Sequence, residues 1–352
     1  MAAGPLDPSR LLSTGSTLLN LACTGRIEGG FVPGHYYFLV GDSDSGKTFL
    51  ALTCFAEATI NPTFGNYRLI YDGTEGGAMM DIARFFGRRV ADRMEPPARE
   101  KDGTPRNSLT IQDFYFNVDD ALEVGRPFIY VLDSQDCLSS KEEIAKFAEN
   151  KQAARKARKP GAKEPAGSYG DSKAKWHSSS LRKILGPLAK SGSILIIINQ
   201  TRDSFDLFEK SSYSGGRALL FYATLQLWSR PGGKIKRTVQ GKERQLGIRS
   251  KVRVRKNRIT GRDRTVEIPI FHSVGIDDIG GCVDWLVEEK VWEESSGVIT
   301  TIGIGPPMEL RREALVRAIQ EHGLEQDLKE LVGAKWEGIE RACEVRRLSR
   351  YL

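Results

Sequence analysis

The chain has 352 residues, a formal net charge of +7 and a hydrophobic content of 40%. This length allows two domains with full cores, and the composition is ordinary for a globular protein. No apolar run approaches the ~20 residues of a membrane helix, and residues 1–10 lack the features of a signal peptide. We therefore expect a cytoplasmic protein without a membrane partner. Five scattered cysteines without a C-x-x-C pair predict reduced thiols and argue against a zinc site.

Positive charge is concentrated in two stretches of the chain. Residues 151–163 hold six Lys or Arg and no acid, and residues 228–264 hold fourteen against two acids. Clusters of this kind usually face an anionic polymer or surface. The alternative for either cluster is a solvated basic face.

The stretch VGDSDSGKTFLAL, residues 40–52, contains glycines, a lysine and a threonine in the spacing G-x-x-x-x-G-K-[ST]. In this pattern backbone N–H groups surround phosphate, the lysine reaches the β- and γ-phosphates, and the threonine hydroxyl is a Mg²⁺ ligand. An apolar, strand-like stretch precedes it and a helix-like stretch follows, so the helix N-terminus adds its dipole. The sequence predicts a nucleoside triphosphate site formed by Gly41, Asp42, Ser43, Asp44, Ser45, Gly46, Lys47 and Thr48.

Three more stretches, residues 67–77, 127–138 and 192–203, predict buried strands because their apolar runs are nearly continuous. Helical patterns lie between them. The alternation predicts an α/β fold with a doubly wound, mostly parallel sheet and ligands at the carboxyl ends of its strands. Short helical patterns from about residue 275 predict a small α-rich C-terminal domain, residues 275–352, after a core of residues 1–274.

Acidic residues follow two of these strands. Asp133 closes one of them, at the place where a P-loop NTPase holds Mg²⁺, although an Asp there is commonly only a cap. Asp72 and Glu75 compete to be the carboxylate that orients the attacking water. Glu75 is favoured because it has the longer reach and lies among three glycines.

Two stretches predict loops. Residues 141–170 begin as a helical pattern and become basic and broken by Pro and Gly, so this part is disordered or ordered by a partner. Residues 203–216 carry aromatics, including Phe205, on a Gly/Ser-rich stretch. Such aromatics suit stacking among unpaired bases, or they pack back onto the core. Residues 248–259 alternate basic and apolar side chains, which predicts a half-buried strand.

In this order the pieces resemble the RecA family of ATP-dependent DNA recombinases, particularly its bacteriophage branch. The resemblance spans about residues 11–295. It implies a RecA-type P-loop core, ATP and Mg²⁺ as cofactors, and a homo-oligomeric filament on single-stranded DNA. It also implies strand exchange with duplex DNA, single-strand-binding or mediator partners, and a bacterial host cytoplasm. The stretches that carry it are LLSTGSTLLNLACTG, the phosphate loop, IYDGTEGG, YVLDS, IINQTR, SGGRALLFYA, VRKNRI and GIDDIGGCVDWLVEEKVW.

The resemblance also implies roles for particular residues. Gln200 is similar to the family's switch between the γ-phosphate and DNA, and completes a catalytic set with Lys47 and Glu75. Residues of about 161–175 and 202–217 are similar to the first and second DNA loops. The DNA-contacting residues assigned in this way are Lys173, Lys175, Arg202, Phe205, Gly215, Gly216 and Arg217.

A second group implied by the resemblance belongs to a subunit interface. Lys256 and Arg258 match the cations that reach a neighbouring subunit's ATP, and Phe221 resembles a residue buried in that interface. Ile82 stands where the family usually has an aromatic that stacks on adenine.

Two other functions remain open. One is a RecA-like accessory protein that anneals or loads single strands, which is favoured by the short stretch, residues 1–12, ahead of STGS. The other is a ring-forming, helicase-type motor, which would need an arginine finger and a separate helicase or primase domain that we do not find in the sequence.

Overall fold

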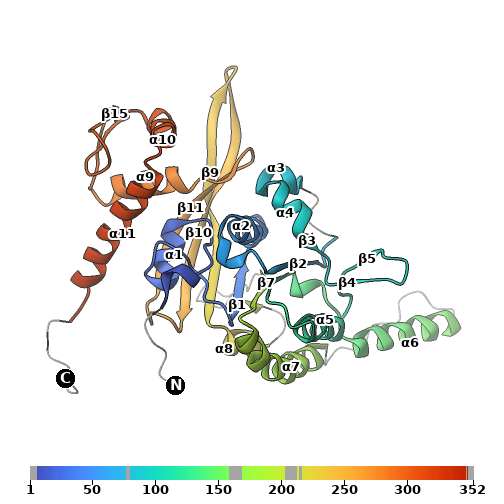
Figure 1. Cartoon of the computed structure of the whole chain (residues 1–352). Coiled ribbons are helices and arrows are strands. Elements are labelled where there is room, and N and C mark those ends of the chain that lie inside the picture. Colours follow the sequence, from blue (N-terminus) through green and yellow to red (C-terminus); the bar gives the residue numbers. More distant parts are fainter. Residues whose placement is uncertain are drawn as a thin grey trace.

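The computed structural model of the chain describes residues 6–76, 80–157, 169–202, 212–213, 216–345 and 347, and Figure 1 labels its elements. The main sheet consists of β1 (Tyr36–Gly41), β2 (Arg68–Gly73), β3 (Met94–Glu95), β6 (Phe128–Asp133), β7 (Ile194–Arg202), β8 (Ser212–Tyr213), β9 (Leu225–Val239), β10 (Lys242–Asn257), β11 (Arg264–Phe271) and β12 (Gly275–Ile276). Their order is β12-β11-β10-β9-β1-β7-β6-β2-β3, with β8 beside β7. Strands from β9 to β3 are parallel, and those from β9 to β12 are antiparallel. The fold is therefore α/β with a mostly parallel central sheet, as predicted.

The buried strands expected from the sequence are present as β1, β2, β6 and β7. Every residue of β1 and β6 is buried, which is typical of parallel strands covered by helices on both faces. Alternate side chains of β1 enter different cores: Tyr37 and Leu39 face one, and Tyr36, Phe38 and Val40 face the other.

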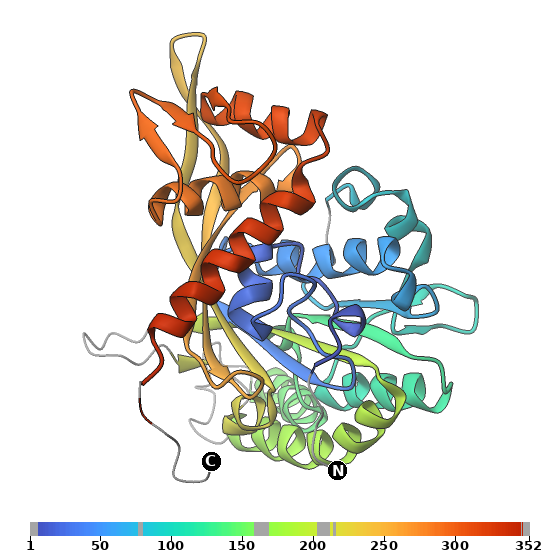
Figure 2. The same cartoon turned by 60° about the vertical axis from the view of Figure 1, so that its left-hand side comes forward.

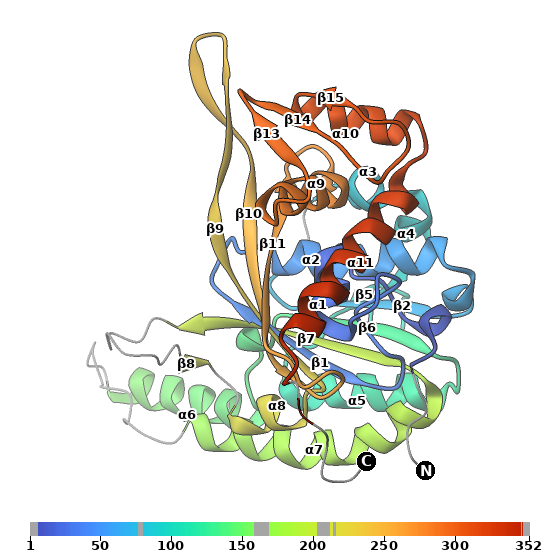
Figure 3. The same ribbon diagram turned by 90° about the vertical axis from the view of Figure 1, so that its left-hand side faces the viewer.

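Helices cover both faces of the parallel strands. Figure 3 shows α5, α7 and α8 on one side of the sheet and α1, α2 and the C-terminal helices on the other. Among the described helices none is both long and apolar enough to cross a bilayer. The helices that precede β9 in the chain are α1 (Thr17–Thr24), α2 (Lys47–Ile60), α3 (Ile82–Phe86), α4 (Arg88–Arg93), α5 (Ile111–Glu123), α6 (Lys141–Ala157), α7 (Tyr169–Ser191) and α8 (Arg217–Tyr222). In a separate two-stranded sheet, β4 (Ala98–Arg99) pairs with β5 (Pro105–Arg106).

Strands β9 and β10 form a long antiparallel hairpin. Where β10 also pairs with β11, Val252 and Val254 are buried while Arg253 and Arg255 are exposed, so the predicted half-buried strand is confirmed. The tip, residues 236–245, lies beyond β11 and projects from the rest of the molecule (Figure 2).

The C-terminal region contains α9 (Asp278–Glu288), β13 (Glu293–Ser295), β14 (Val298–Thr300), β15 (Glu309–Leu310), α10 (Arg312–Glu321) and α11 (Glu325–Ala342). Its apolar residues, among them Leu286 and Val332, belong to the same core as α1 and β11. Arg264 of β11 donates to both carboxylate oxygens of Glu340 in α11, at 2.6 and 2.7 Å. The division at residues 274 and 275 stays a prediction.

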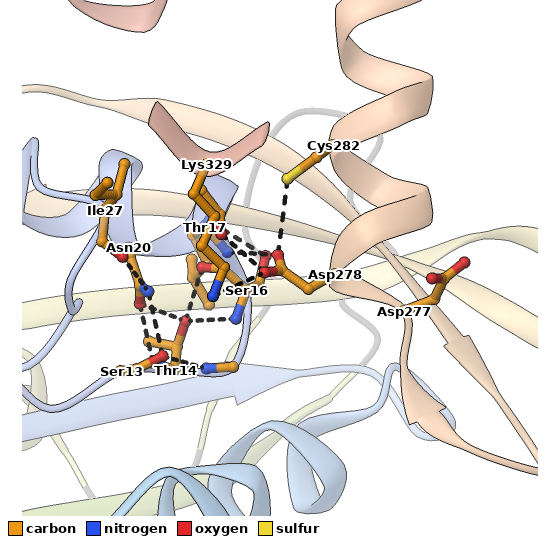
Figure 4. A network of polar contacts seen from close by, with 12 residues as sticks. Ser13, Thr14, Ser16, Thr17, Asn20, Ile27, Asp277, Asp278, Cys282 and Lys329 are labelled. Atoms are coloured by element: carbon orange, nitrogen blue, oxygen red, sulfur yellow. Dashed lines mark hydrogen bonds and ion pairs between the residues drawn. The ribbon is translucent and has the colours of Figure 1, made fainter. Parts of the chain in front are cut away.

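A polar joint around Asp278 connects this region to α1 (Figure 4). The Asp278 carboxylate accepts hydrogen bonds from the backbone N–H and the hydroxyl of Thr17, at 2.6 and 2.8 Å. Lys329 of α11 lies 3.8 Å from the same carboxylate. Because Thr17 begins α1, the carboxylate also interacts favourably with the positive end of that helix. This joint therefore holds α1, α9 and α11 together.

Candidate nucleotide-binding and nucleic-acid site

The phosphate loop joins the carboxyl end of β1 to the first residue of α2, as predicted. Its glycines are required by close contacts. A Cβ on Gly41 would lie 2.0 Å from the Ser229 carbonyl oxygen, and one on Gly46, whose φ is 84°, would lie 2.5 Å from Ile270 Cδ1. Because α2 starts at Lys47, the N–H groups of its first turn lack partners within the helix and can bind phosphate.

Lys47 lies folded against this loop. Its Nζ donates to the carbonyl oxygens of Gly41 and Asp42, at 2.9 and 2.6 Å. Burial lowers the pKa of the Lys47 ammonium, and the carboxylates of Asp133 and Glu75 oppose this shift. The ammonium is therefore held inside the phosphate loop by two backbone carbonyl oxygens.

Thr48 and Asp133 converge at the end of β6. The Thr48 hydroxyl donates to Asp133 Oδ2 at 2.7 Å, and the Tyr71 hydroxyl donates to the same oxygen at 3.0 Å. Burial raises the pKa of the Asp133 carboxyl, against the effect of these hydrogen bonds. Nowhere in the described ranges do three or more His, Cys, Asp or Glu residues form a metal cage. A hydroxyl and one carboxylate instead fit Mg²⁺ bound chiefly by phosphate and water.

The structure separates the two acids that competed for the catalytic role. Asp72 is 0% exposed, and its carboxylate accepts from Ser108 N, Ser108 Oγ and the Tyr130 hydroxyl at 2.9, 2.6 and 2.7 Å. Burial raises the pKa of Asp72. Glu75 is exposed and accepts from Gln200 Nε2 at 2.8 Å and from the Ser134 hydroxyl. Glu75 therefore faces the nucleotide loop, whereas Asp72 binds the segment before α5.

These residues line one cavity of about 1050 Å³. Residues 43–48 of the phosphate loop, with Glu75, Asp133 and Gln200, form one side of it, whereas Gly41, Asp42 and Asp72 do not line it. The other side was missed in the sequence, because it comes from the distant β9–β10 hairpin and from β11, and no motif marks it. Ile82 does not line the cavity. The additional lining residues are Phe49, Ser134, Ile198, Pro231, Gly232, Gly233, Lys234, Gln245, Ile248, Ile270, Phe271 and His272.

Lys256, Arg258 and Phe221 lie together at the end of the strands away from the phosphate loop. Lys256 Nζ donates to the Leu220 and Phe221 carbonyls at 2.9 and 2.7 Å, and Arg258 donates to Phe221 at 2.8 Å. Both cations lie over the Phe221 ring, which is 63% exposed. Burial, with Arg258 as a second cause, lowers the pKa of Lys256 to about 8.

Strand register shows where Lys256 lies along the sheet. Lys256 pairs with Gln226, which is level with Phe38 near the start of β1, whereas the phosphate loop follows the end of β1. Lys256 and Arg258 therefore lie at the level of the first half of β1, away from the phosphate loop, and neither lines the cavity of about 1050 Å³.

The first predicted DNA loop is shorter than expected. Residues 169–175 are helical, since α7 begins at Tyr169. Contacts with the start of α6 extend the helix: Lys173, whose side chain is 17% exposed, lies 3.6 Å from Glu143, and the hydroxyls of Ser172 and Ser140 are 3.0 Å apart. The sequence pattern could not show these contacts, because α6 and α7 are separated by the basic stretch. Lys175 is exposed.

The second predicted DNA loop is described only at residue 202, at residues 212–213, which form β8, and at residues 216–217. Arg202 ends β7 and Arg217 begins α8, while Phe205 and Gly215 lie outside the described residues. A Cβ on Gly216 would lie 2.6 Å from that of Ala174, so the end of the second segment lies against the start of α7. The two predicted DNA segments are therefore neighbours.

A second hollow, of about 790 Å³, lies on the exposed face of β9 and β10. We call it the cationic groove. The Arg255 guanidinium lies 5.0 Å from the centre of the Trp228 ring. Its lining residues are Asp42, Thr201, Trp228, Ser229, Arg230, Lys251, Arg253, Arg255 and Thr265.

The sequence of this chain is similar to those of known proteins over most of its length. The sequence profile of the RecA N-terminal domain matches residues 156–277. A protein named RecA from Chlorobaculum parvum is 30% identical over 293 residues, which cover 79% of this chain and 70% of that relative. This chain belongs to the RecA family. RecA from Syntrophus aciditrophicus is 28% identical over 346 residues, covering 92% of this chain and 88% of the relative. A crystal structure of the RadB recombinase aligns with a TM-score of 0.46 at 17% identity, covering 76% of this chain and 98% of the other.

Membership of the RecA family supports a nucleotide-hydrolysing enzyme that binds ATP with Mg²⁺. The span matched to the N-terminal domain includes Gln200, Lys256 and Arg258. The phosphate loop lies outside that span, and its assignment rests on its own spacing and geometry.

Proposed function

We propose that this chain is an ATP-dependent DNA recombinase that assembles on single-stranded DNA and promotes homologous pairing and strand exchange. The observation that carries the proposal is the place of Gln200. Its side chain donates to Glu75 at the nucleotide cavity, and its chain continues directly into the second DNA segment. A change at the γ-phosphate can therefore be transmitted to residues that contact DNA.

We assign ATP hydrolysis to residues that lie together at the nucleotide cavity. Lys47 binds the β- and γ-phosphates, Thr48 and Asp133 hold Mg²⁺, and Glu75 orients the attacking water. Mg²⁺ supplies charge neutralisation on the phosphates. Gln200, through its contact with Glu75, senses the γ-phosphate. No covalent step on DNA is involved.

Filament assembly is assigned to the end of the strands away from the phosphate loop. An exposed Phe221 ring flanked by Lys256 and Arg258 suits burial against a second copy, whose nucleotide the two cations then reach. ATP is bound between protomers in this arrangement, which explains why nucleotide, assembly and DNA affinity would be coupled.

DNA binding is assigned to the neighbouring segments at Lys173, Lys175 and Arg217, and to the cationic groove. Cations along a groove beside an aromatic ring suit a phosphate backbone with unpaired bases. Duplex DNA, mediator proteins, and a bacteriophage origin with a bacterial cytoplasm as the working compartment belong to the same proposal.

Electron microscopy of the protein on long single-stranded DNA, with and without a non-hydrolysable ATP analogue, tests the proposal. We expect continuous helical filaments with the analogue. Closed rings would indicate a helicase-type motor. Sparsely covered DNA in both conditions would indicate an accessory protein.

A mixing experiment tests the shared site. Lys47→Ala and Lys256→Ala proteins should each lack ATP hydrolysis, and a mixture of the two should recover part of it. Recovery follows because some interfaces would then pair an intact phosphate loop with an intact Lys256. No recovery would contradict the action of Lys256 across an interface.

A further inference from the structure

Asp42 in the phosphate loop contacts both the nucleotide-binding lysine and the strand that leads to the second DNA segment. Its carbonyl oxygen accepts from Lys47 Nζ at 2.6 Å and from the Ser45 hydroxyl at 2.7 Å. Its carboxylate accepts a hydrogen bond from the hydroxyl of Thr201. Strand register accounts for this contact, because Gly41 of β1 is paired with Gln200 of β7, which places the next residue of each strand side by side.

This contact is separate from the one made by Gln200. Successive residues of a strand point to opposite faces, so Gln200 reaches Glu75 while Thr201 reaches Asp42. Two side chains at the end of β7 are thus tied to two different places: Gln200 to Glu75 in the nucleotide cavity, and Thr201 to Asp42, which lines the cationic groove.

Asp42 also affects the charge of the cationic groove. Among the described residues that line this groove, Asp42 is the one acid, and four cations line it as well: Arg230, Lys251, Arg255 and Arg253, the last of which is paired with Asp263. A carboxylate at this place opposes the entry of a phosphate backbone, because like charges repel over the length of such a groove.

We propose that Asp42 is a positioning residue that couples phosphate binding at Lys47 to the position of Thr201 and to the charge of the cationic groove. This inference rests on the proposed function, since it takes the nucleotide and single-stranded DNA as the two ligands. Phosphate competes with the Asp42 carbonyl for the Lys47 ammonium. Once this bond is lost, Ser45 is the remaining donor to the Asp42 carbonyl, so the peptide turns more easily and its carboxylate can leave Thr201 and the groove. Nucleotide binding then frees the end of β7 at Thr201 and removes a negative charge from the cationic groove.

Two variants separate the charge of Asp42 from its hydrogen bond. Asp42→Asn removes the charge and keeps an oxygen that can accept from Thr201. Thr201→Val removes the hydroxyl and keeps the charge. Thr201→Ser restores the hydroxyl, and Asp119→Asn makes the same charge change at an exposed site on α5.

The measured quantity is the ratio of the dissociation constant for a fluorescent oligo-dT without nucleotide to that with saturating AMP-PNP. We expect Asp42→Asn to lower this ratio about three- to fivefold, as for one surface charge contact. Thr201→Val should lower it by a similar factor, because the end of β7 loses its hydrogen bond to Asp42. Both variants should do so by binding DNA more tightly without nucleotide. Thr201→Ser and Asp119→Asn should keep the wild-type ratio. Melting temperatures and AMP-PNP affinities exclude misfolding as the cause.

The possible results distinguish the inference from the proposed function. If the wild type binds DNA equally with and without AMP-PNP, the proposed function itself fails. If the wild-type ratio is large and Asp42→Asn and Thr201→Val match Asp119→Asn, the coupling through Asp42 is overturned while the proposed function stands. A lower ratio that comes only from weaker binding with AMP-PNP would also overturn it.

Discussion

Two regions of this molecule hold a carboxylate beside a threonine, and they use it differently. At the nucleotide cavity, Asp133 accepts from Thr48 and Tyr71 and borders a cavity of about 1050 Å³. At the polar joint, Asp278 accepts from the backbone and hydroxyl of Thr17 and lies beside Lys329. Burial raises the pKa of both carboxyls.

The difference lies in what surrounds each carboxylate. The partners of Asp278 come from two other helices, α1 and α11, so its charge is compensated within the fold. The main cation near Asp133 is Lys47, whose ammonium is held only by loop carbonyls and can move to phosphate. A carboxylate compensated by fixed elements stabilises the fold, and one beside an exchangeable cation serves ligand binding.

Replacing Asp133 should produce the largest effect on activity. We expect Asp133→Asn to lower ATP hydrolysis by about a thousandfold, because Mg²⁺ would lose its protein carboxylate. Stability should change little, since the buried charge is removed along with its desolvation cost. Phosphate release and urea unfolding measure the two quantities. A normal hydrolysis rate would contradict the role of Asp133.

Replacing Glu75 and Asp72 tests the same contrast, between a carboxylate that acts in hydrolysis and one that stabilises the fold. Glu75→Gln should lower hydrolysis by about a hundredfold while nucleotide binding is kept. Asp72→Asn should instead destabilise the fold, because Ser108 and Tyr130 would each lose a charged acceptor. Steady-state kinetics, nucleotide titration and thermal unfolding of both variants give the answer. The assignment is wrong if Asp72→Asn is the one that stops hydrolysis in a stably folded protein.

Removing the polar joint should lower stability and leave the chemistry intact. Asp278→Ala leaves the Thr17 N–H and Lys329 without their acceptor, and we expect a loss of about 2 kcal/mol in the free energy of unfolding. ATP hydrolysis below the unfolding transition should equal that of the wild type. Thr17→Val should show a smaller loss, because it keeps the backbone N–H bond.

The contributions of Asp278 and Glu340 to stability should change with pH in opposite directions. We expect both changes to be smaller than the effects predicted above. The folded pKa of Asp278 is raised, so between about pH 4 and that pKa the folded state holds more protons than the unfolded state. The stabilisation by Asp278 therefore falls as pH rises through this window. Hydrogen bonds from Arg264 lower the pKa of Glu340 below its usual range. Its contribution is complete above the unfolded pKa and is lost as pH falls through the folded one.

Unfolding of Asp278→Asn and Glu340→Gln proteins between pH 3 and pH 7 measures these contributions. The difference in stability between wild type and Asp278→Asn should shrink with rising pH. The difference between wild type and Glu340→Gln should grow. Equal slopes for the two would show that both carboxyls respond alike.

Much of the site could be predicted from short-range patterns. The phosphate loop, Asp133 at the end of β6 and Gln200 at the end of β7 all follow buried strands, and parallel strands bring their carboxyl ends to one edge. The far side of the cavity could not be predicted, because Lys234 and His272 come from strands that reach it only through long-range pairing. The helical start of α7 was missed for a related reason, since its contact with Glu143 joins two separate helices.

By itself, the sequence determined the α/β fold class, the strands and the phosphate loop, because hydrophobic periodicity and a local motif with fixed spacing decide these features. The tertiary structure placed Glu75 at the cavity and Asp72 against Ser108, since their surroundings depend on which segments pack on each face of β2. It also placed Lys256 and Arg258 at the edge away from their own phosphate loop, which follows from the antiparallel pairing of β9 and β10. Such choices depend on strand order and register, which are set by contacts between residues distant in the chain.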